Sequence, residues 1–382
     1  MAQVHGMRER NTRTFSRGER KNMKKIISLL LSLMLLLGCC SIASADGVAA
    51  SDLMIGAILI GDTSDMGFNY SHQQGLLAMA KECGISEDQI IILENVADDN
   101  SCADAINELI ANGCNVVIGN SFGFQTYMME AATANPEVYF CHYSGLLNND
   151  TNFCRFNARN YQTRYLQGIA AAMRSQTGKL GYVAAFKNAE NNVSINAFAL
   201  GAQSINPDIE LYVKYTNSWY DPAGETAAAH ALIDMGCDVL GQYVNTTGPQ
   251  VAAQERGVWG LGSDADMTEF APDAHLFAVC MDWGAIYTTV MNTILNGSFA
   301  GGLIYGDVAD GTLYMTPYSK NIVEGTEEAI KVIWDKLAAS EWDVFQQDVY
   351  DNQGNLIPAS TFTDDYLYSG MTDLLVKGVF EK

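Results

Sequence analysis

The segment from Gly61 to Tyr70 follows directly on an apolar run, Leu53 to Ile60, and this junction constrains the fold more than any other feature of the chain. The apolar run predicts a buried β-strand, and the polar, glycine-bearing segment predicts a loop that leads into a helix. This order places the loop at the carboxyl edge of a parallel sheet, where open α/β sheets bind ligands. The loop supplies a carboxylate from Asp65, a ring from Phe68 and an amide from Asn69, but no Lys or Arg. These groups suit a flat heterocycle better than a phosphate.

Strand and helix patterns then alternate along the chain at the spacing typical of α/β proteins. We expect strands at residues 53–60, 89–93, 116–118, 138–142, 179–185, 210–215, 239–242 and 258–262, and helices at residues 70–82, 101–112, 124–134, 164–175, 193–204, 223–235, 248–254 and 327–338. The series predicts two doubly wound units, each of about 100 residues or more. Two such units in one chain predict two lobes that face each other across a cleft.

Residues 1–45 predict export and lie outside the expected fold. Lysines precede the apolar run 26–37 and small residues follow it, which is the pattern of a secretory signal. The run is shorter than the about 20 residues that a membrane-spanning helix needs, and Met23 is the expected natural start. Two cleavage sites stay open. The A-x-A sequence at 43–45 would release the protein, whereas the lipobox-like sequence before Cys39 would leave that cysteine lipidated, on the outer face of the cytoplasmic membrane or in the periplasm.

The charge balance excludes one class of partner. The chain carries 22 Lys and Arg against 44 Asp and Glu, a net charge of −22. Without residues 1–45, which hold eight basic and two acidic residues, the net charge is −28. Such an acidic surface repels nucleic acid, and the sequence has no basic stripe, so we expect no DNA or RNA partner.

The cysteines predict no disulfide framework. Seven cysteines follow Cys40, their number is odd, and none forms a C-x-x-C pair. Most lie among apolar residues and are expected in the core, with a single disulfide left open. Because no His, Cys and Asp cluster has ligand spacing, we expect neither a metal nor a cofactor.

One segment is compatible with an enzymatic function. Residues 119–123 read Gly-Asn-Ser-Phe-Gly, which matches the G-x-S-x-G nucleophile elbow between a strand and a helix. Ser121 would be the nucleophile, and His275 lies downstream. The alternative is that these are loop residues at a strand end, and the expectation is that the protein is not an enzyme.

Aromatic residues mark a pocket more strongly. Phe68, Phe122, Trp219 and Trp283 all follow predicted strands or crossovers instead of lying within periodic core stripes. Rings that enclose a planar molecule, with carboxylates and amides at its edges, describe a small-molecule site. Trp219 is the sharpest case, because an Asp cap and a Pro at the first turn of the next helix, residues 221–222, fix it at the helix entrance.

Several segments together resemble one family, the basic membrane protein family of substrate-binding lipoproteins. They are Gly67-Phe68-Asn69, Tyr165-Leu166-Gln167-Gly168, Ser218-Trp219-Tyr220-Asp221-Pro222, Gly262-Ser263-Asp264-Ala265-Asp266 and Leu295-Asn296-Gly297. The resemblance covers residues 52–350. It implies a type I periplasmic-binding-protein fold, with two doubly wound lobes, a hinge and a ligand cleft, which serves ABC transporters for purine nucleosides.

The resemblance implies roles for individual residues. The family holds the purine ring between two aromatic rings, and Phe68 and Trp219 match them by position. Asp264 matches an aspartate on the sugar side of the ligand, and Asp65 could accept a hydrogen bond from an exocyclic amino group. Edge hydrogen bonds are expected from Asp65, Asn95 or Ser121. The complete set of expected ligand-binding residues is Asp65, Phe68, Asn69, Asn95, Ser121, Phe122, Trp219, Asp264, Asp282 and Trp283.

Two departures affect the choice of ligand. Nucleoside binders carry an Asp-containing pair where this chain has Leu59-Ile60, and a Lys where it has Asp282-Trp283. The segments 94–97, 120–123 and 158–161 resemble free-adenine binders. A purine is therefore expected, with the base ahead of the nucleoside.

The implied domain organisation interleaves the lobes. Residues 52–157 and 281–302 form the first lobe, residues 158–280 and 303–350 form the second, and residues 351–382 are a C-terminal extension. The expected function is that of a monomeric receptor that delivers a purine to an ABC permease. A ligand-sensing module for a signalling partner, and a hydrolase that uses Ser121, stay open as alternatives.

Overall fold

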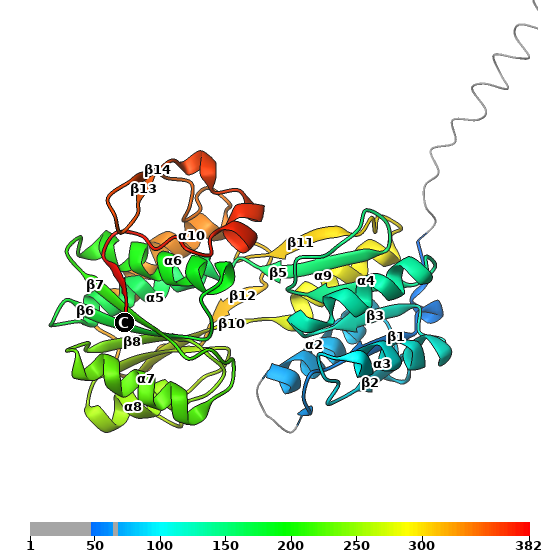
Figure 1. Cartoon of the computed structure of the whole chain (residues 1–382), viewed down its shortest axis with the longest axis horizontal. Coiled ribbons are helices and arrows are strands. Elements are labelled where there is room, and N and C mark those ends of the chain that lie inside the picture. The colour runs from blue at the N-terminus through cyan, green and yellow to red at the C-terminus, as the bar shows by residue number, and fades with distance from the viewer. Residues whose placement is uncertain (1–46, 64–67) are drawn as a thin grey trace, which may run out of the picture. The chain divides into compact units, whose positions relative to one another are not determined.

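The computed structural model describes residues 47–63 and 68–382. Asp65 and Cys39 lie outside the described residues. From residue 47 onward the chain forms one compact unit that contains two large sheets, each covered by helices on both faces (Figure 1). Within the described residues, no helix combines the length and apolar composition that a membrane crossing needs.

The first sheet is entirely parallel. Its strands are β1 (Ile55–Ile58), β2 (Ile90–Leu93), β3 (Val116–Gly119), β4 (Tyr139–Tyr143), β5 (Phe153–Ala158) and β11 (Gly302–Gly306), in the order β11-β5-β4-β3-β1-β2. Strands β1, β3 and β5 are buried along their whole length. Continuous apolar runs such as that of β1 are what a parallel sheet covered on both faces requires.

Two pairs of helices cover this sheet. Helices α2 (Phe68–Cys83) and α9 (Trp283–Leu295) pack on one face, and α3 (Asn100–Ala111) and α4 (Gln125–Ala134) pack on the other. Asp99 caps α3 by accepting from the Ser101 N–H at 2.8 Å. Helices α2 and α9 approach closely at Gly75, where a Cβ would lie 2.3 Å from the Cβ of Trp283.

The second sheet repeats the build with an antiparallel strand at one edge. Its strands are β6 (Lys179–Ala184), β7 (Glu210–Tyr215), β8 (Val239–Tyr243), β9 (Trp259–Ser263), β10 (His275–Met281), β12 (Leu313–Met315) and β15 (Val379–Glu381), in the order β12-β10-β9-β8-β6-β7-β15. Only β12 runs antiparallel to its neighbour.

Helices also cover both faces of the second sheet. Helices α5 (Tyr161–Arg174), α6 (Ala189–Ile205) and α10 (Thr326–Ala338) lie on one face, and α7 (Pro222–Asp234) and α8 (Gly248–Arg256) lie on the other. The predicted cap of α7 is confirmed, because Asp221 accepts from the Gly224 N–H at 3.0 Å and Pro222 opens the first turn.

The chain passes between the sheets three times, from β5 to α5, from β10 to α9 and from β11 to β12. The boundary expected after residue 302 falls within β11, which pairs with β5, so the first sheet continues to Gly306. The expected extension 351–382 ends in β15, which pairs with β7 and completes the second sheet. The remaining short elements are β13 (Val349–Tyr350), β14 (Leu356–Ile357), a π-helix (Tyr366–Gly370) and 3₁₀ turns at Ala50–Asp52, Glu87–Gln89, Phe122–Phe124 and Ala359–Thr361.

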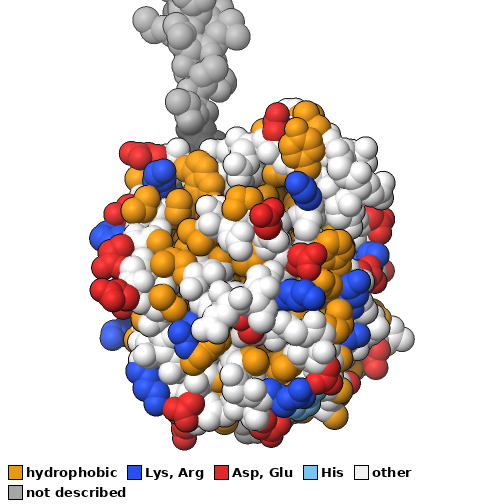
Figure 2. All heavy atoms as spheres, turned by 90° about the vertical axis from the view of Figure 1, so that its left-hand side faces the viewer, with side chains coloured by type: hydrophobic (Ala, Val, Ile, Leu, Met, Phe, Trp, Pro, Cys, Tyr) orange, Lys and Arg blue, Asp and Glu red, His pale blue; other side chains and the backbone are white. Residues whose placement is uncertain are grey.

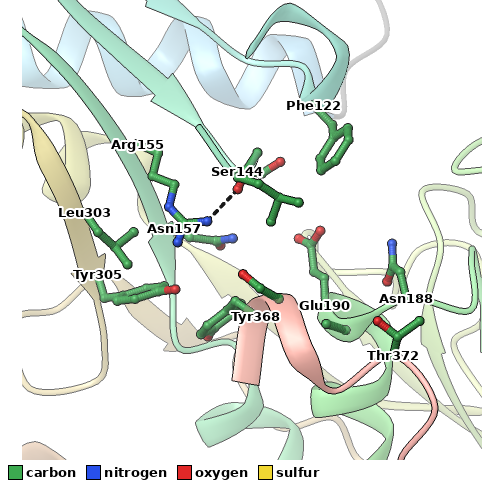
Figure 3. A pocket seen from close by; sticks show the side chains of 14 residues that line it. Phe122, Ser144, Arg155, Asn157, Asn188, Glu190, Leu303, Tyr305, Tyr368 and Thr372 are labelled. Carbon is green, nitrogen blue, oxygen red and sulfur yellow. Dashed lines mark hydrogen bonds between the residues drawn. The ribbon is translucent and has the colours of Figure 1, made fainter. Parts of the chain in front are cut away.

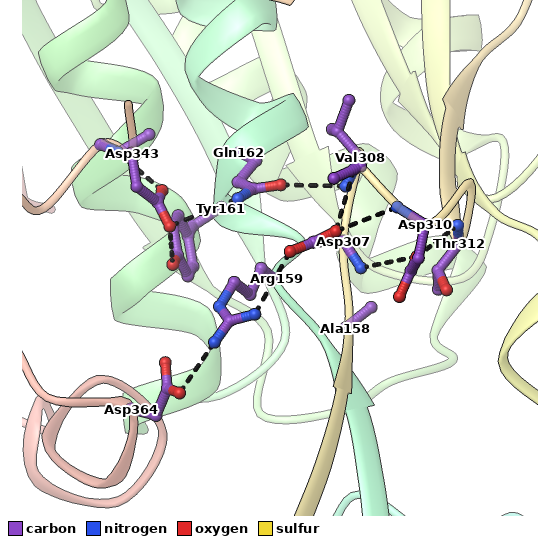
Figure 4. Close-up of polar contacts among 12 residues, drawn as sticks. Ala158, Arg159, Tyr161, Gln162, Asp307, Val308, Asp310, Thr312, Asp343 and Asp364 are labelled. Atoms are coloured by element: carbon purple, nitrogen blue, oxygen red, sulfur yellow. Dashed lines mark hydrogen bonds and ion pairs between the residues drawn. The ribbon is translucent and has the colours of Figure 1, made fainter. Parts of the chain in front are cut away.

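A single arginine joins two of these crossovers to the C-terminal segment (Figure 4). Arg159, between β5 and α5, pairs with Asp307 at 3.3 Å and with Asp364 at 2.8 Å. Its backbone N–H donates to the Gly306 carbonyl at 2.8 Å. Tyr368 of the π-helix donates to the Ala158 carbonyl at 2.7 Å. The C-terminal segment is thus fastened at the hinge.

One face of the second lobe shows how the surface charge is distributed. Figure 2 shows acidic and basic side chains interspersed there, with hydrophobic side chains between them and no broad basic area. The face offers no continuous track for a polyanion.

Candidate ligand-binding site

Both sheets have a topological switch point at their carboxyl edges. In the first sheet β1 lies between β2 and β3, and in the second β6 lies between β7 and β8. Loops at such a point diverge and leave a crevice in which α/β proteins bind ligands. Among the residues expected from the sequence, Asn95 follows β2, Ser121 and Phe122 follow β3, Trp219 follows β7 and Asp264 follows β9.

Asn69 holds the two loops of the first switch point together. Its side chain is buried, and its Oδ1 accepts from the Asn120 Nδ2 at 3.0 Å and from the Gly61 N–H at 3.2 Å. The Oδ1 of Asn120 in turn accepts from the Ile60 N–H at 2.9 Å. Asn95 is exposed, adopts a φ of 56°, and donates its backbone N–H to Gly61. These amides fix the shape of the crevice wall.

Phe68 begins α2 as a half-buried ring. Its ring centroid lies 4.4 Å from that of His72, 6.0 Å from that of Trp283 and 6.2 Å from that of Tyr143. Edge-to-face contacts of this kind hold a ring in position while leaving part of its surface open.

The structure places Asp282 and Trp283 at the start of α9. Trp283 is only 7% exposed and packs in the core of the first lobe, 3.7 Å from the His72 ring and 4.7 Å from the Tyr143 ring. Asp282 caps α9 by accepting from the Ala285 N–H at 3.0 Å. Trp283 therefore packs behind Phe68, with 6.0 Å between the two ring centroids.

Trp219 is the matching ring of the second lobe. It is half-buried in the loop after β7 and makes edge contacts with Phe186 at 5.7 Å and Tyr243 at 5.5 Å. Its backbone carbonyl accepts from the Asn245 N–H at 3.0 Å, which ties the loop after β7 to the loop after β8.

A buried carboxylate, which sequence reasoning missed, reinforces this tie. Glu225 of α7 is fully buried and accepts from the Asp221 N–H at 3.0 Å and from the Thr246 N–H at 3.2 Å. Asp221 and Glu225 are four residues apart, whereas the partners of a capping box are three apart, so the pattern was only a weak signal in the sequence. Glu225 orients both loops around Trp219.

Two tyrosines lie between the rings of the two lobes. The Tyr243 hydroxyl donates to Glu190 Oε1 at 3.1 Å and accepts from Asn160 Nδ2 at 3.2 Å. Burial, with the negative charges of Glu190 and Asp264, raises the pKa of Tyr143 well above its usual value, and Tyr243 opposes this shift. Phe68, Tyr143, Tyr243 and Trp219 therefore form one row of aromatic rings that runs from the first lobe to the second.

Asp264 stands at the end of β9 with a φ of 67°. Its Oδ2 accepts from the Ser263 hydroxyl at 2.7 Å, and the Ser263 Oγ accepts from the Arg164 Nη2 at 2.7 Å. The loss of hydration raises the pKa of Asp264, while Arg164 and Ser263 lower it. The guanidinium of Arg164 also lies 4.7 Å from the Tyr243 ring centroid. A buried cation thus supports both the carboxylate and the ring.

Glu190→Gln should stabilise the protein at alkaline pH. Burial raises the pKa of Glu190 from 4.5 to about 7, the Tyr243 hydrogen bond opposes the shift, and Asp264 adds to it. The folded protein therefore favours the protonated carboxyl, whose contribution to stability is complete below pH 4.5 and is lost as the pH rises through 7. At pH 8 the free energy of unfolding, measured in urea, should be about 1–2 kcal/mol higher for the Gln variant than for the wild type. At pH 4 the two proteins should have the same free energy of unfolding.

The exposed Glu341 provides the control for this experiment. Glu341→Gln should leave the free energy of unfolding unchanged at both pH values. An equal gain in the two variants, or a gain of Glu190→Gln that does not vary with pH, would contradict the assignment.

A cavity of about 140 Å³, the hinge-side cavity, is lined by side chains of β5 and β11 near the crossovers (Figure 3). Residues of both lobes and of the C-terminal segment line it: Phe122, Ser144, Gly145, Leu146, Arg155, Asn157, Asn188, Ala189, Glu190, Leu303, Tyr305, Tyr368, Ser369 and Thr372. Of the expected residues that the structure describes, only Phe122, which is 52% exposed, belongs to this lining. Glu190 links the cavity to Tyr243 and hence to the rings.

The geometry does not support a hydrolase. The Ser121 hydroxyl donates to Asp98 Oδ2 at 3.1 Å, and the His142 Nε2 lies 2.7 Å from the backbone carbonyl of Ser121, not from its hydroxyl. His275 is buried in the second sheet, where its Nδ1 bonds the Gln250 side chain. Burial lowers the pKa of His142 and of His275 to about 4. A nucleophile paired with its base, as acyl transfer requires, is thus not formed by these residues.

Comparison with known proteins identifies relatives along most of the chain. The family model described as "ABC transporter substrate-binding protein PnrA-like" matches residues 53–347. A purine-binding protein of Brucella abortus is 33% identical over 87% of this chain and 95% of its own length. A putative ABC transporter glucose-binding protein of Haloferax volcanii is 30% identical over 84% of this chain and 79% of its own length.

Solved structures show the same fold. A transcriptional activator of the comK gene from Bacillus halodurans superposes with a TM-score of 0.66 at 22% identity, covering 76% of this chain and 99% of that protein. Periplasmic-binding-type architecture with two lobes therefore extends over most of the described residues.

Proposed function

Because the chain belongs to the ABC transporter substrate-binding protein PnrA-like family, we propose that its solute is a purine, with the free base ahead of the nucleoside. Proteins of this family bind solutes outside the cytoplasmic membrane for an ABC transporter. The partner is then a membrane permease, the receptor acts as a monomer, and Cys39 or the A-x-A site at 43–45 decides whether it is tethered or released.

One observation carries the choice of a planar ligand. Each lobe presents a half-buried ring at a carboxyl sheet edge, Phe68 in the first and Trp219 in the second. Tyr143 and Tyr243 lie between them. Stacking on an aromatic face contributes roughly 1–3 kcal/mol per base, whichever base it is. The Brucella relative is named for purine binding, which agrees with this arrangement.

The proposed mechanism is closure about the three crossovers. A purine first stacks on the ring of one lobe, and the second lobe then adds its ring and its polar groups. Only the closed form makes both sets of contacts, so the ligand shifts the population toward closure. Asp264 and Ser121 are the proposed edge partners, and a mismatched edge would leave a buried polar group without a partner.

Titration calorimetry on ligand-stripped protein tests the proposal. Adenine, adenosine, guanosine, hypoxanthine and glucose form the panel, because the Haloferax relative is named for glucose. We expect adenine or a related purine to bind with a Kd in the micromolar range or tighter and glucose not to bind. Failure of every purine would refute the purine proposal, and binding of glucose alone would replace it with a sugar receptor.

A further inference from the structure

Arg155 is a buried cation without an anionic partner. It lies on β5 and is only 7% exposed. Its Nη1 donates to the Gly145 carbonyl at 2.8 Å, its Nε is buried without an acceptor, and no ion pair reaches it within residues 47–63 and 68–382. A guanidinium carries five N–H donors, so one carbonyl satisfies only part of it. Burying a charge without a counter-charge costs roughly several kcal/mol of folding free energy.

The guanidinium borders the hinge-side cavity described above (Figure 3). Asn157 lies two residues further along the same strand and on the same face, so its amide lines the same wall. The strand pairing places Leu303 beside Arg155 and Tyr305 beside Asn157. The first lobe thus lines the cavity with a guanidinium and an amide, and Leu303 and Tyr305 add apolar surface beside them.

The opposite wall comes from the second lobe and the C-terminal segment. Figure 3 shows Asn188 and Glu190, at the start of α6, and Thr372 across the cavity from Arg155. Glu190 is the one carboxylate among the described residues of the lining, and it accepts a hydrogen bond from Tyr243. Burial and Asp264 raise the pKa of Glu190 to about 7, so below that pH the wall facing Arg155 is uncharged.

We propose that this cavity binds a small anionic group, a carboxylate or a phosphate, on the Arg155 guanidinium. The planar fork of Arg matches both groups through paired hydrogen bonds. The volume of about 140 Å³ is close to that of a cavity of roughly 150 Å³ that holds a benzene molecule. The site therefore takes a group of about that size and not a whole nucleotide. The group is a substituent of the solute in the cleft or a separate anion that binds beside it.

Arg155→Met tests the site, with Arg256→Met as the control, since Arg256 lies on the surface in an ion pair with Asp234. Sodium acetate, sodium benzoate and inorganic phosphate are titrated into the ligand-stripped full chain against sodium chloride at equal ionic strength. We expect at least one of these anions to bind the wild type and the Arg256→Met variant alike, and to bind Arg155→Met at least about tenfold more weakly.

A second readout separates a ligand site from a structural role. Without an anion, Arg155→Met should unfold at the same denaturant concentration as the wild type or at a higher one, because an unpaired buried charge is removed. Arg155→Lys should keep part of the anion affinity, since it keeps the charge but loses the fork. Failure of all three anions to bind, or equal binding to Arg155→Met, would overturn the proposal.

Adenine distinguishes the sources of the anion. If the anion is a substituent of the solute, adenine linked to a carboxylate or phosphate should bind more tightly than adenine, and Arg155→Met should cancel the gain. If the anion is separate, adenine and the free anion should bind together without competition. If the protein binds an anion but no purine, the anion site is supported and the purine proposal is refuted. If it binds a purine but no anion, the purine proposal is supported and the anion site is refuted.

Discussion

Trp219→Ala should weaken purine binding by about 10- to 100-fold, because one of the two proposed stacking faces is lost. The ring is half-buried and makes T-shaped contacts with Phe186 and Tyr243. We therefore expect the free energy of unfolding to fall by only about 1–2 kcal/mol, less than for a buried aromatic core residue. Trp219→Phe should keep most of the affinity. Calorimetry and urea unfolding on the same preparations give both quantities.

Trp342 offers a matched control in the same lobe. It is also half-buried, and its ring makes an edge contact with Tyr165 of α5 at 5.2 Å. Trp342→Ala should lower stability by a similar amount and leave purine affinity unchanged. If the two Ala variants lose affinity equally, or if Trp219→Ala binds as the wild type does, Trp219 is a core residue and the stacking proposal fails.

Arg164→Met should lower the free energy of unfolding by about 3 kcal/mol at pH 8, because it removes one member of a buried charged network. Arg164 is 2% exposed and bonds Gln167 at 3.2 Å and Ser263 at 2.7 Å. Its charge lowers the pKa of Asp264, which burial raises. Without that charge the pKa of Asp264 rises further, so the loss of stability should become smaller as the pH falls toward 4 and the carboxyl takes up a proton.

The double variant Arg164→Met, Asp264→Asn provides the control for charge. It should recover part of the loss at pH 8 and little at pH 4, as measured by urea unfolding at both values. A loss of stability that is the same at both pH values, with no recovery in the double variant, would show that Arg164 acts through packing alone.

The alternation of strand and helix patterns was enough to predict the doubly wound lobes, because strands such as β1 and β3 are short apolar runs bounded by turn residues. Strands β5, β10, β11 and β12 and helix α9 were not predicted as elements. β5 carries Arg155 and Asn157 within a fully buried strand, so its polarity hides it. Sequence spacing also cannot show that β11 returns to the first sheet, because that pairing joins residues far apart in the chain.

The candidate site was predicted in part. Phe68 opens α2 and Trp219 lies just before α7, in each case after a strand, and the sequence contains this order of strand, polar segment and helix. The sequence could not show that the ring of Trp283 packs in the core of the first lobe, because a ring that opens a helix points into the core or the cleft depending on the turn of that helix. Tyr143, Glu190, Tyr243 and Arg155 come together only through the tertiary fold, and periodicity gives no sign of it.

The three crossovers limit which fragments of the chain can fold on their own. The first sheet needs β11 at its edge and α9 on its face, and the chain reaches both only after most of the second sheet has been made. Neither lobe corresponds to one uninterrupted stretch of polypeptide, so a truncated fragment would leave an unpaired edge strand or an uncovered apolar face. Native assembly therefore requires contacts between distant segments, which makes folding slower and ties the two halves into a shared cooperative transition.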